Sequence, residues 1–224
     1  MTETSPLASV CRPLAAHEGL DQAPLLTSQG RVPPGVDVRL VGEDGREAPW
    51  DGKTVGEIQV RGNWIAADYY CDAASAEKFM DGWLRTGDVA SIDADGYIRV
   101  SDRTKDLVKS GGEWISSVAL EGLIMGHPDV AEAAVVAVPH PKWDERPLAC
   151  VVPRPEARGR LTKEAILDHV RPHVARWWLP DDVVFIEAVP KTSVGKFDKK
   201  ALRERFKGHA LPVGNSGPVG PDRE

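Results

Sequence analysis

The sequence predicts an α+β protein made of two unlike parts, and three observations support this prediction. Strand-like alternation of apolar and polar residues dominates the first half, whereas helical and strand patterns mix in the second. Hydrophobic residues make up 42% of the chain, which is enough to build packed cores. A length of 224 residues suits one large domain or two small ones. We therefore expect a small, partly barrel-like antiparallel piece followed by a compact α+β domain.

Residues 1–101 are predicted to form the barrel-like piece. Alternating patterns typical of strands fall at 36–41, 56–62, 88–93 and 97–101. Residues 1–35 show little periodicity and many turn formers. Asp72 is suited to cap a short helix over 73–79. Gly96 supplies the left-handed position of the turn between the last two strands.

Residues 108–207 are predicted to form the α+β domain. The predicted strands cover 131–138, 146–152 and 182–188, and the predicted helices cover 118–125, a segment after Thr162, and 198–206. Either hydroxyl of Ser116-Ser117 is suited to cap the first helix, and that of Thr162 is suited to cap the second. Pro172 must kink or restart the second helix, because proline cannot continue the hydrogen-bond ladder. A loop is expected over 140–145.

Two further segments belong to neither part. Residues 102–107 lie where the character of the chain changes, so they are predicted to link the two parts. Residues 208–224 contain several Gly and Pro and are predicted to be a disordered tail.

Composition argues against several kinds of partner and site. The formal net charge of −6 argues against a nucleic-acid partner, which usually needs a basic face. No apolar run approaches the roughly 20 residues of a membrane span. A basic-then-apolar leader is also lacking at the start of these residues. Cys11, Cys71 and Cys150 lack the spacing of a metal site. We expect a cytoplasmic protein with three reduced thiols.

Three separated strings carry the functional signal. They are WLRTGDVASIDADGYIRV at 83–100, SDRTKDL at 101–107 and PKTSVGKFDKKALRERF at 190–206. In this order and separation they resemble the adenylate-forming (AMP-binding) superfamily, whose members activate carboxylic acids with ATP. Longer strings, among them GGEWISS and EAAVVAVPHPKWDERPLACVV, resemble bacterial medium- and long-chain fatty acid–CoA ligases. The resemblance implies the end of a large N-terminal domain followed by the family's small α+β C-terminal domain.

Forming an acyl-adenylate brings a carboxylate to the α-phosphorus of ATP, so fixed cations must offset the accumulating negative charge. The resemblance assigns Asp88 and Arg103 to the ribose of the nucleotide. It assigns Lys196 to the carboxylate and α-phosphate, a catalytic role that suits a compact charge on a flexible stem. Taken singly, Asp88 can be an ordinary turn residue and Lys196 one more cation beside Lys199 and Lys200. Their co-occurrence in the family's order favours the functional interpretation.

The resemblance also implies a hinge and a path for coenzyme A. Family members pass from adenylation to thioester formation by rotating the C-terminal domain about one residue, which by resemblance is Lys105. KSGGEW at 109–114 resembles the hairpin that lines the pantetheine path of CoA. The residues that would line this path are Gly111, Gly112, Glu113 and Trp114. Missing side chains let a ligand pass close to the backbone, but a plain turn explains the two glycines equally well.

The string MTETSP at 1–6 resembles the end of the family's Tyr-Gly-x-Thr-Glu motif, without its Tyr-Gly. By resemblance, Thr2 would contact the α-phosphate and Glu3 would help to hold magnesium. A frayed N-terminus explains these residues as well, because no strand precedes them in the sequence.

The family's phosphate loop and acid pocket do not occur in these residues. The resemblance therefore implies the C-terminal segment of an AMP-forming fatty acid–CoA ligase, which uses ATP, magnesium, CoA and a fatty acid and is incomplete for catalysis alone. The remaining half can reside on a separate partner chain, or the segment can come from a misstarted or degraded gene. The alternative is a non-catalytic partner-binding or regulatory module that retains the fold.

Overall fold

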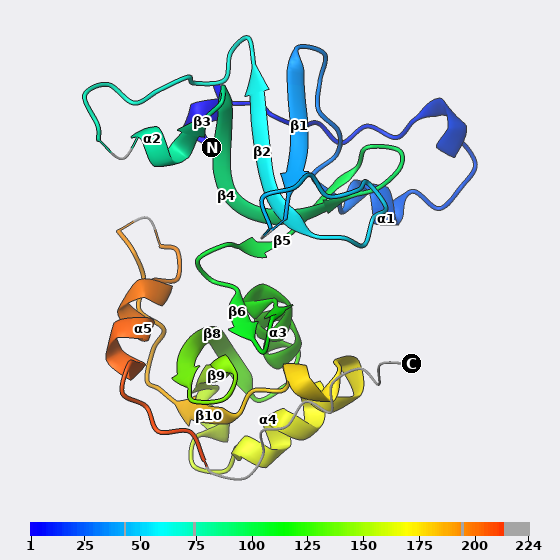
Figure 1. The fold of residues 1–224 in the computed structure, drawn as a ribbon. Coiled ribbons are helices and arrows are strands. Elements are labelled where there is room, and N and C mark those ends of the chain that lie inside the picture. The colour runs from blue at the N-terminus through cyan, green and yellow to red at the C-terminus, as the bar shows by residue number, and fades with distance from the viewer. Residues whose placement is uncertain (43, 74, 194, 213–224) are drawn as a thin grey trace, which may run out of the picture. The chain divides into compact units, whose positions relative to one another are not determined.

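The computed structural model describes residues 1–42, 44–73, 75–193 and 195–212, and its contacts divide the chain into two units (Figure 1). Unit 1 is Met1–Lys105 and unit 2 is Asp106–Glu224. The division falls inside the predicted linker at 102–107. From position 213 onward, the tail predicted at 208–224 lies outside the described residues.

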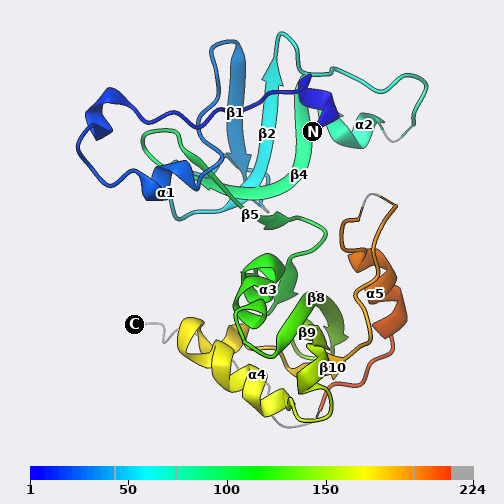
Figure 2. The same ribbon diagram turned by 180° about the vertical axis from the view of Figure 1, so that it is seen from behind.

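Unit 1 is built on a five-stranded antiparallel sheet (Figures 1 and 2). Its strands are β1 (Val36–Val41), β2 (Gly56–Gly62), β3 (Phe79–Met80), β4 (Trp83–Ile92) and β5 (Ile98–Arg103). The order is β1-β2-β4-β3, and β5 also pairs with β4. Figure 1 shows β4 as a long, bent strand. Over the described residues the sheet stays open, so the piece predicted as barrel-like is a bent sheet and not a closed barrel.

Alternation along the strands produces the core of unit 1. The side chains buried together there are Val36, Leu40, Ile58, Val60, Leu84, Ala90, Ile92 and Ile98. Even spacings within each strand place them on the same side, because successive strand side chains point to opposite faces. The strands predicted at 36–41 and 56–62 are confirmed, and the predicted hairpin strands extend further than expected.

Residues 1–35 contain short elements that the sequence did not predict. They are the 3₁₀ helices η1 (Thr2–Thr4) and η2 (Ala15–His17) and the helix α1 (Ala23–Leu26). Tyr97, which is fully buried between β4 and β5, donates its hydroxyl to Arg12 O at 2.9 Å and accepts from Leu14 N at 3.1 Å. Single turns carry no periodic pattern, so contacts of this kind with the sheet fix the segment instead.

The helix predicted at 73–79 is shorter in the structure. The helix α2 is described as Ser75–Lys78, and position 74 lies outside the described residues. Phe79 instead begins β3 and pairs with Leu84 of β4. This cross-strand pairing overrides the helical pattern at the end of the predicted segment.

Unit 2 combines a five-stranded sheet with helices (Figures 1 and 2). The strands are β6 (Val108–Ser110), β7 (Glu113–Ile115), β8 (Val130–His140), β9 (Asp144–Pro153) and β10 (Asp182–Phe185). The α-helices described are α3 (Ser117–Met125), α4 (Lys163–Val170) and α5 (Lys199–Phe206), and the 3₁₀ turns are η3 (Pro155–Ala157), η4 (Arg171–His173) and η5 (Arg176–Trp178). The order is β10-β9-β6-β7 with β8 also on β9, and β10 runs parallel to β9 whereas the other pairs are antiparallel.

The strand β8 is buried on both faces, which explains its nearly continuous apolar run. Ala133 and Val135 belong to a core shared with α3 and α4, whereas Ala134, Val136 and Val138 belong to a second core shared with α5. Because successive strand residues point to opposite faces, the helices must cover both sides of the sheet. The α+β class predicted from the sequence is therefore confirmed.

Of the two serines predicted as the cap of α3, Ser116 is the cap and Ser117 is the first helical residue, and the predicted Thr162 cap of α4 is confirmed. Ser116 Oγ accepts a hydrogen bond from Ala119 N at 3.2 Å, and Thr162 Oγ1 accepts one from Ala165 N at 3.2 Å. The helix α4 ends before Pro172, and the chain continues there as η4.

The connection predicted at 140–145 is shorter than expected. His140 ends β8, Asp144 begins β9, and the two residues are paired across the strands. Asp144 adopts a φ of 61°, a left-handed value that a tight reversal favours. The reversal brings Trp143 against the β6–β7 turn, where its carbonyl accepts a hydrogen bond from Gly111 N at 3.0 Å.

Candidate functional site

Asp88 and Arg103 come together across β4 and β5. They are partners in the strand register, and Arg103 Nε lies 3.2 Å from Asp88 Oδ1. Just before Asp88, Gly87 adopts a φ of 74° and Thr86 Oγ1 accepts a hydrogen bond from Asp88 N at 3.1 Å. The Asp88 side chain is 26% exposed and that of Arg103 is 56% exposed, so both groups reach solvent. The pair presents a carboxylate acceptor beside a guanidinium donor, which suits a ligand with adjacent hydroxyls.

A cavity of about 370 Å³ adjoins this pair within unit 1. The charged side chains that line it are Glu57, Glu77, Lys78, Arg85, Arg103 and Lys105. Two of its cations are neutralised, because Arg85 Nη2 lies 2.8 Å from Glu57 Oε2 and Arg103 pairs with Asp88. The side chains left outside these pairs are Lys78, Lys105 and Glu77, so cations remain in excess and the cavity favours an anionic ligand.

Lys196 lies in a short loop directly before α5. Thr192 holds its backbone, because Thr192 N donates to Lys196 O at 2.7 Å and Lys196 N donates to Thr192 Oγ1 at 3.2 Å. Gly195 closes the loop with a φ of 81°. The Lys196 side chain is exposed, and the described ranges show no hydrogen bond or ion pair of its ammonium. The backbone of Lys196 is thus held in place while its ammonium is available to contact an anionic ligand.

Gly111 and Gly112 form the turn between β6 and β7, with φ values of 61° and 86°. A Cβ on Gly111 would lie 2.9 Å from Cε3 of Trp143, whereas a Cβ on Gly112 would meet no heavy atom within 4 Å. Packing and turn geometry both require the first glycine, but only turn geometry requires the second. Glu113 is exposed and Trp114 is half-buried. The turn that the sequence suggested is present, and space remains open beside Gly112.

Thr2 and Glu3 lie in η1, and contacts from the segment before α2 hold this turn. Tyr69 donates its hydroxyl to Glu3 Oε1 at 2.6 Å, and Ala66 N donates to Glu3 O at 2.8 Å. The hydrogen bond from Tyr69 lowers the pKa of Glu3, so its carboxylate is ionised near neutral pH. Across the described residues, no three His, Cys, Asp or Glu gather as a metal site. Glu3 alone would give magnesium one oxygen ligand. Phosphate oxygens of a bound nucleotide would have to supply further ligands.

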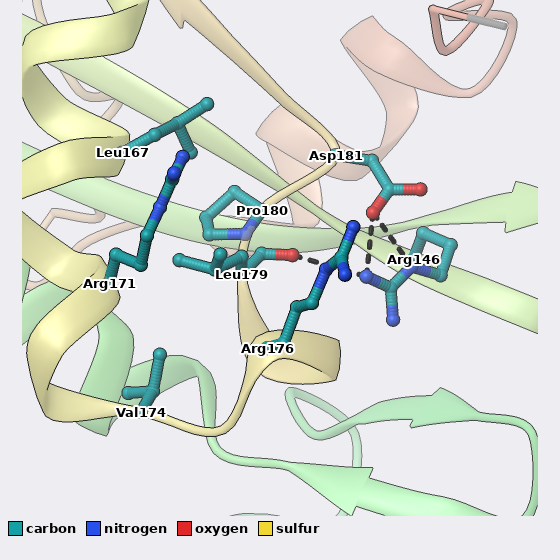
Figure 3. A pocket seen from close by; sticks show the side chains of 8 residues that line it. All are labelled: Arg146, Leu167, Arg171, Val174, Arg176, Leu179, Pro180 and Asp181. Carbon is teal, nitrogen blue, oxygen red and sulfur yellow. Dashed lines mark hydrogen bonds and ion pairs between the residues drawn. The ribbon is translucent and has the colours of Figure 1, made fainter. Parts of the chain in front are cut away.

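Unit 2 contains a second cationic cavity, of about 430 Å³, that sequence reasoning missed (Figure 3). Arg146 is only 3% exposed and donates to Asp181 Oδ1 at 2.6 Å and to Ser110 Oγ at 2.8 Å. Arg171 and Arg176 are more exposed and line the same cavity. Its apolar wall consists of Leu167, Val174, Leu179 and Pro180. Because Ser110 ends β6, Arg146 links this cavity to the β6–β7 turn.

For one residue of the unit 2 cavity, Arg146, the sequence contains a pattern that indicates a special role. Arg146 begins the strand predicted at 146–152, whose other residues are apolar, and a charge in such a strand usually needs a buried partner. Arg171 and Arg176 flank a proline-containing stretch, but their convergence depends on two 3₁₀ turns that have no periodic pattern. Trp143 gave no signal, because its contact with Gly111 depends on how β8 turns into β9.

The chain is similar in sequence to known proteins. Residues 119–196 match the family described as AMP-binding enzyme C-terminal domain. The chain is 49% identical to the long-chain-fatty-acid–CoA ligase of Thermus thermophilus, over 93% of this chain and 39% of that protein. It is 47% identical to the 3-methylmercaptopropionyl-CoA ligase of Ruegeria lacuscaerulensis, over 92% of this chain and 38% of that protein. The chain thus spans less than two fifths of the length of these relatives.

Solved structures show the same architecture. The o-succinylbenzoate CoA synthetase of Bacillus subtilis, in complex with an acyl-adenylate, matches with a TM-score of 0.76 at 27% identity, over 94% of this chain and 40% of that one. ATP-bound MatB from Rhodopseudomonas palustris matches with a TM-score of 0.72 at 31% identity, over 81% of this chain and 36% of that one.

The chain therefore belongs to the adenylate-forming, AMP-binding enzymes. Within them its relatives are AMP-forming acid–CoA ligases, as the three strings and the longer strings implied. Among the helices that the structure describes, none has the length and apolar character needed to cross a membrane.

Proposed function

We propose that this chain supplies the ribose contacts, the adenylation lysine and part of the thiol path of an AMP-forming fatty acid–CoA ligase. The pairing of Asp88 with Arg103 beside the cationic cavity of unit 1 carries this proposal. The Asp88 carboxylate can accept hydrogen bonds from two adjacent ribose hydroxyls while Arg103 keeps it oriented. The remaining cations of the cavity suit the phosphate groups of the same nucleotide.

Lys196 is the proposed catalytic residue of the first half-reaction. A carboxylate oxygen of the acid attacks the α-phosphorus of ATP, and pyrophosphate leaves. The uncommitted ammonium of Lys196 would stabilise the negative charge that two anionic groups bring together. Thr2 is the proposed α-phosphate contact, and Glu3 is the proposed oxygen ligand of magnesium, which would offset phosphate charge when bound.

Two relatives support a fatty acid as the acid substrate. The chain is 49% identical to a long-chain ligase from Thermus thermophilus and 43% identical to the medium-chain-fatty-acid–CoA ligase of Ectopseudomonas oleovorans. Other relatives are ligases named for 3-methylmercaptopropionate and trans-cinnamate. Competition among a long-chain fatty acid, a medium-chain fatty acid and cinnamate in the complete enzyme would decide between these classes.

Coenzyme A is the proposed thiol substrate, and two features of unit 2 support it. Open space beside Gly112 would let the pantetheine arm pass close to the backbone. Arg171 and Arg176 offer guanidinium groups to the phosphates at the nucleotide end of CoA. Arg146 joins the two features through its hydrogen bond to Ser110.

Calorimetric titration of the full chain with a non-reactive acyl-adenylate analogue tests the ribose assignment. We expect Asp88→Asn to weaken binding by about tenfold, because asparagine replaces one of the two acceptor oxygens with an amide donor. Asp37→Asn is the matched control, since Asp37 also pairs with a register partner of the same sheet, Arg61, at 2.9 Å. A wild-type chain that does not bind, or equal losses in the two variants, would refute the assignment.

A further inference from the structure

The chain passes from unit 1 to unit 2 through one residue that lies between two anchored neighbours. On the unit 1 side, Thr104 is held by Gly87 O, which accepts from its backbone N at 2.9 Å and from its hydroxyl at 3.2 Å. On the unit 2 side, Asp106 Oδ1 lies 2.6 Å from Arg203 Nη1. Lys105 between them is exposed, and among the described residues no hydrogen bond or ion pair involves it. The backbone freedom of this segment is therefore concentrated at Lys105.

The unit 2 anchor is built on a firmly held helix. Arg203 belongs to α5, and Leu202 beside it is fully buried in the core shared with β8. One turn earlier on the same helix, Lys199 forms a buried ion pair with Glu121 of α3 at 2.7 Å. The Asp106 carboxylate is only 14% exposed, so its bond to Arg203 is largely shielded from water. Arg203 thus connects the first residue of unit 2 to the interior of that unit.

The same helix carries the loop of Lys196 at its N-terminal end. The side chain of Asp198 caps α5 by accepting a hydrogen bond from Ala201 N at 3.0 Å, and Asp198 N donates to Pro190 O at 2.8 Å. One short helix therefore holds both the boundary residue Asp106 and the base of the Lys196 loop. A movement of unit 2 about Lys105 would move the two together.

We propose that Arg203 is a hinge-positioning residue that confines the rotation between the two units to Lys105. This inference rests on the proposed function, together with the rotation between the two half-reactions that the family resemblance implies. Without the Arg203–Asp106 bond, Asp106 and Leu107 would share the change in backbone dihedral angles. The pivot would then spread over several residues, and the orientation of the Lys196 loop would be less sharply defined.

Hydrogen exchange on the full chain tests the local part of the proposal. In Arg203→Gln, exchange at the amides of residues 105–107 should accelerate roughly threefold to tenfold, as expected for the loss of one partly shielded ion pair. Arg205→Gln is the matched control, because Arg205 is an exposed arginine of the same helix that stacks on Phe206. Arg203→Lys should restore most of the protection, because it retains the charge.

Pulsed electron paramagnetic resonance tests the positioning role. Nitroxides on the exposed Cys71 and on Glu164→Cys, in a Cys11→Ser background, report the distribution of distances between the units. Arg203→Gln should broaden this distribution, whereas Arg205→Gln should leave it unchanged. An unchanged distribution, or faster exchange throughout α5 with a lower melting temperature, would show that Arg203 is merely structural and would overturn the proposal. Neither measurement needs ligand or turnover, so failure of the nucleotide-binding test would leave these results interpretable.

Discussion

Lys199 Nζ lies 2.7 Å from Glu121 Oε1, and the two side chains are only 10% and 8% exposed. The same carboxylate oxygen accepts a hydrogen bond from Val135 N at 2.7 Å, and Lys199 also donates to Ser117 Oγ at 2.7 Å. A single carboxylate therefore joins α3, β8 and α5. In the sequence, nothing distinguishes Lys199 from the exposed Lys200 beside it.

Removing one member of this pair should destabilise unit 2 strongly. Lys199→Met removes one partner of a buried ion pair, and such changes cost about 3–5 kcal/mol. Lys207→Met is the control, because its pair with Glu204 is 75% and 79% exposed. Urea unfolding should show a much lower midpoint for the first variant and almost no change for the second. Similar midpoints for the two variants would contradict a buried ion pair.

Alanine substitutions should separate the roles of the two turn glycines. Gly111→Ala adds left-handed strain of about 1–2 kcal/mol to a clash with Trp143, which together should lower the free energy of unfolding by about 2–4 kcal/mol. Gly112→Ala adds only the strain, because the space beside it is open. Thermal and urea unfolding of both variants measure the difference. A larger effect at Gly112 would mean that the turn packs differently.

The cationic cavity of unit 2 should contribute to CoA binding by the full chain. Arg176→Gln removes a guanidinium that has no side-chain ion pair within the described part of the chain, so we expect CoA affinity to fall about tenfold. Arg158→Gln, at an exposed arginine outside the cavity, should leave affinity unchanged. Titration calorimetry at fixed salt compares the CoA affinities of the wild-type chain and the two variants. Equal affinities for all three proteins would exclude the cavity from CoA binding.

In a complete ligase containing this segment, Lys196→Ala should impair the two half-reactions unequally. Pyrophosphate release should fall by about 10²–10³, the range seen when one preorganised electrostatic contact is removed. Thioester formation from supplied acyl-adenylate should change little. Lys200→Ala, at an exposed lysine four positions later, should retain both activities. Comparable losses in both half-reactions would argue against the assignment.

Asp182 should make unit 2 sensitive to acid. Burial alone would raise the pKa of Asp182, but hydrogen bonds from Lys163, His209 and Val183 N outweigh burial and lower this pKa below its ordinary 3.8. A lowered carboxylate pKa contributes stability above the ordinary pKa, and this contribution is lost as pH falls through the folded-state value.

The measurement for this prediction is the urea midpoint between about pH 6 and about pH 2.5. Asp182→Asn should flatten the acid side of the profile. Asp168→Asn, at a side chain that is 68% exposed, should keep the wild-type profile. A wild-type profile in Asp182→Asn would assign the acid sensitivity to other groups.

The elements predicted correctly are those specified by local sequence. Ser116 and Thr162 cap helices because a hydroxyl reaches an amide three residues ahead, and this contact depends on no other part of the chain. The short strand β3 was missed because its pairing with β4, and not its own two residues, defines it. The parallel pairing of β10 with β9 also depends on packing of segments that are distant in sequence.

The residues of the candidate site likewise fall into those that the sequence predicted and those that only folding brings together. The family resemblance predicted that Asp88 and Arg103 both contact the ribose. In the structure they are partners in the strand register and form an ion pair. The role of Arg146 could not be predicted in the same way, because its partners Asp181 and Ser110 come from segments on either side of it in the chain. A short motif specifies which residues occur together, but folding determines which distant groups surround them.

The Glu121–Lys199 pair also imposes an order on the synthesis of unit 2. During translation α3 and β8 emerge before α5, so the ion pair between Glu121 and Lys199 forms only after residue 199 has been made. Until then the second core also lacks Leu202. A nascent unit 2 therefore lacks the contribution of α5 to one face of its sheet until this helix has been made. Translation past α5, and not closure of the sheet, is the event that completes the core and anchors the Lys196 loop.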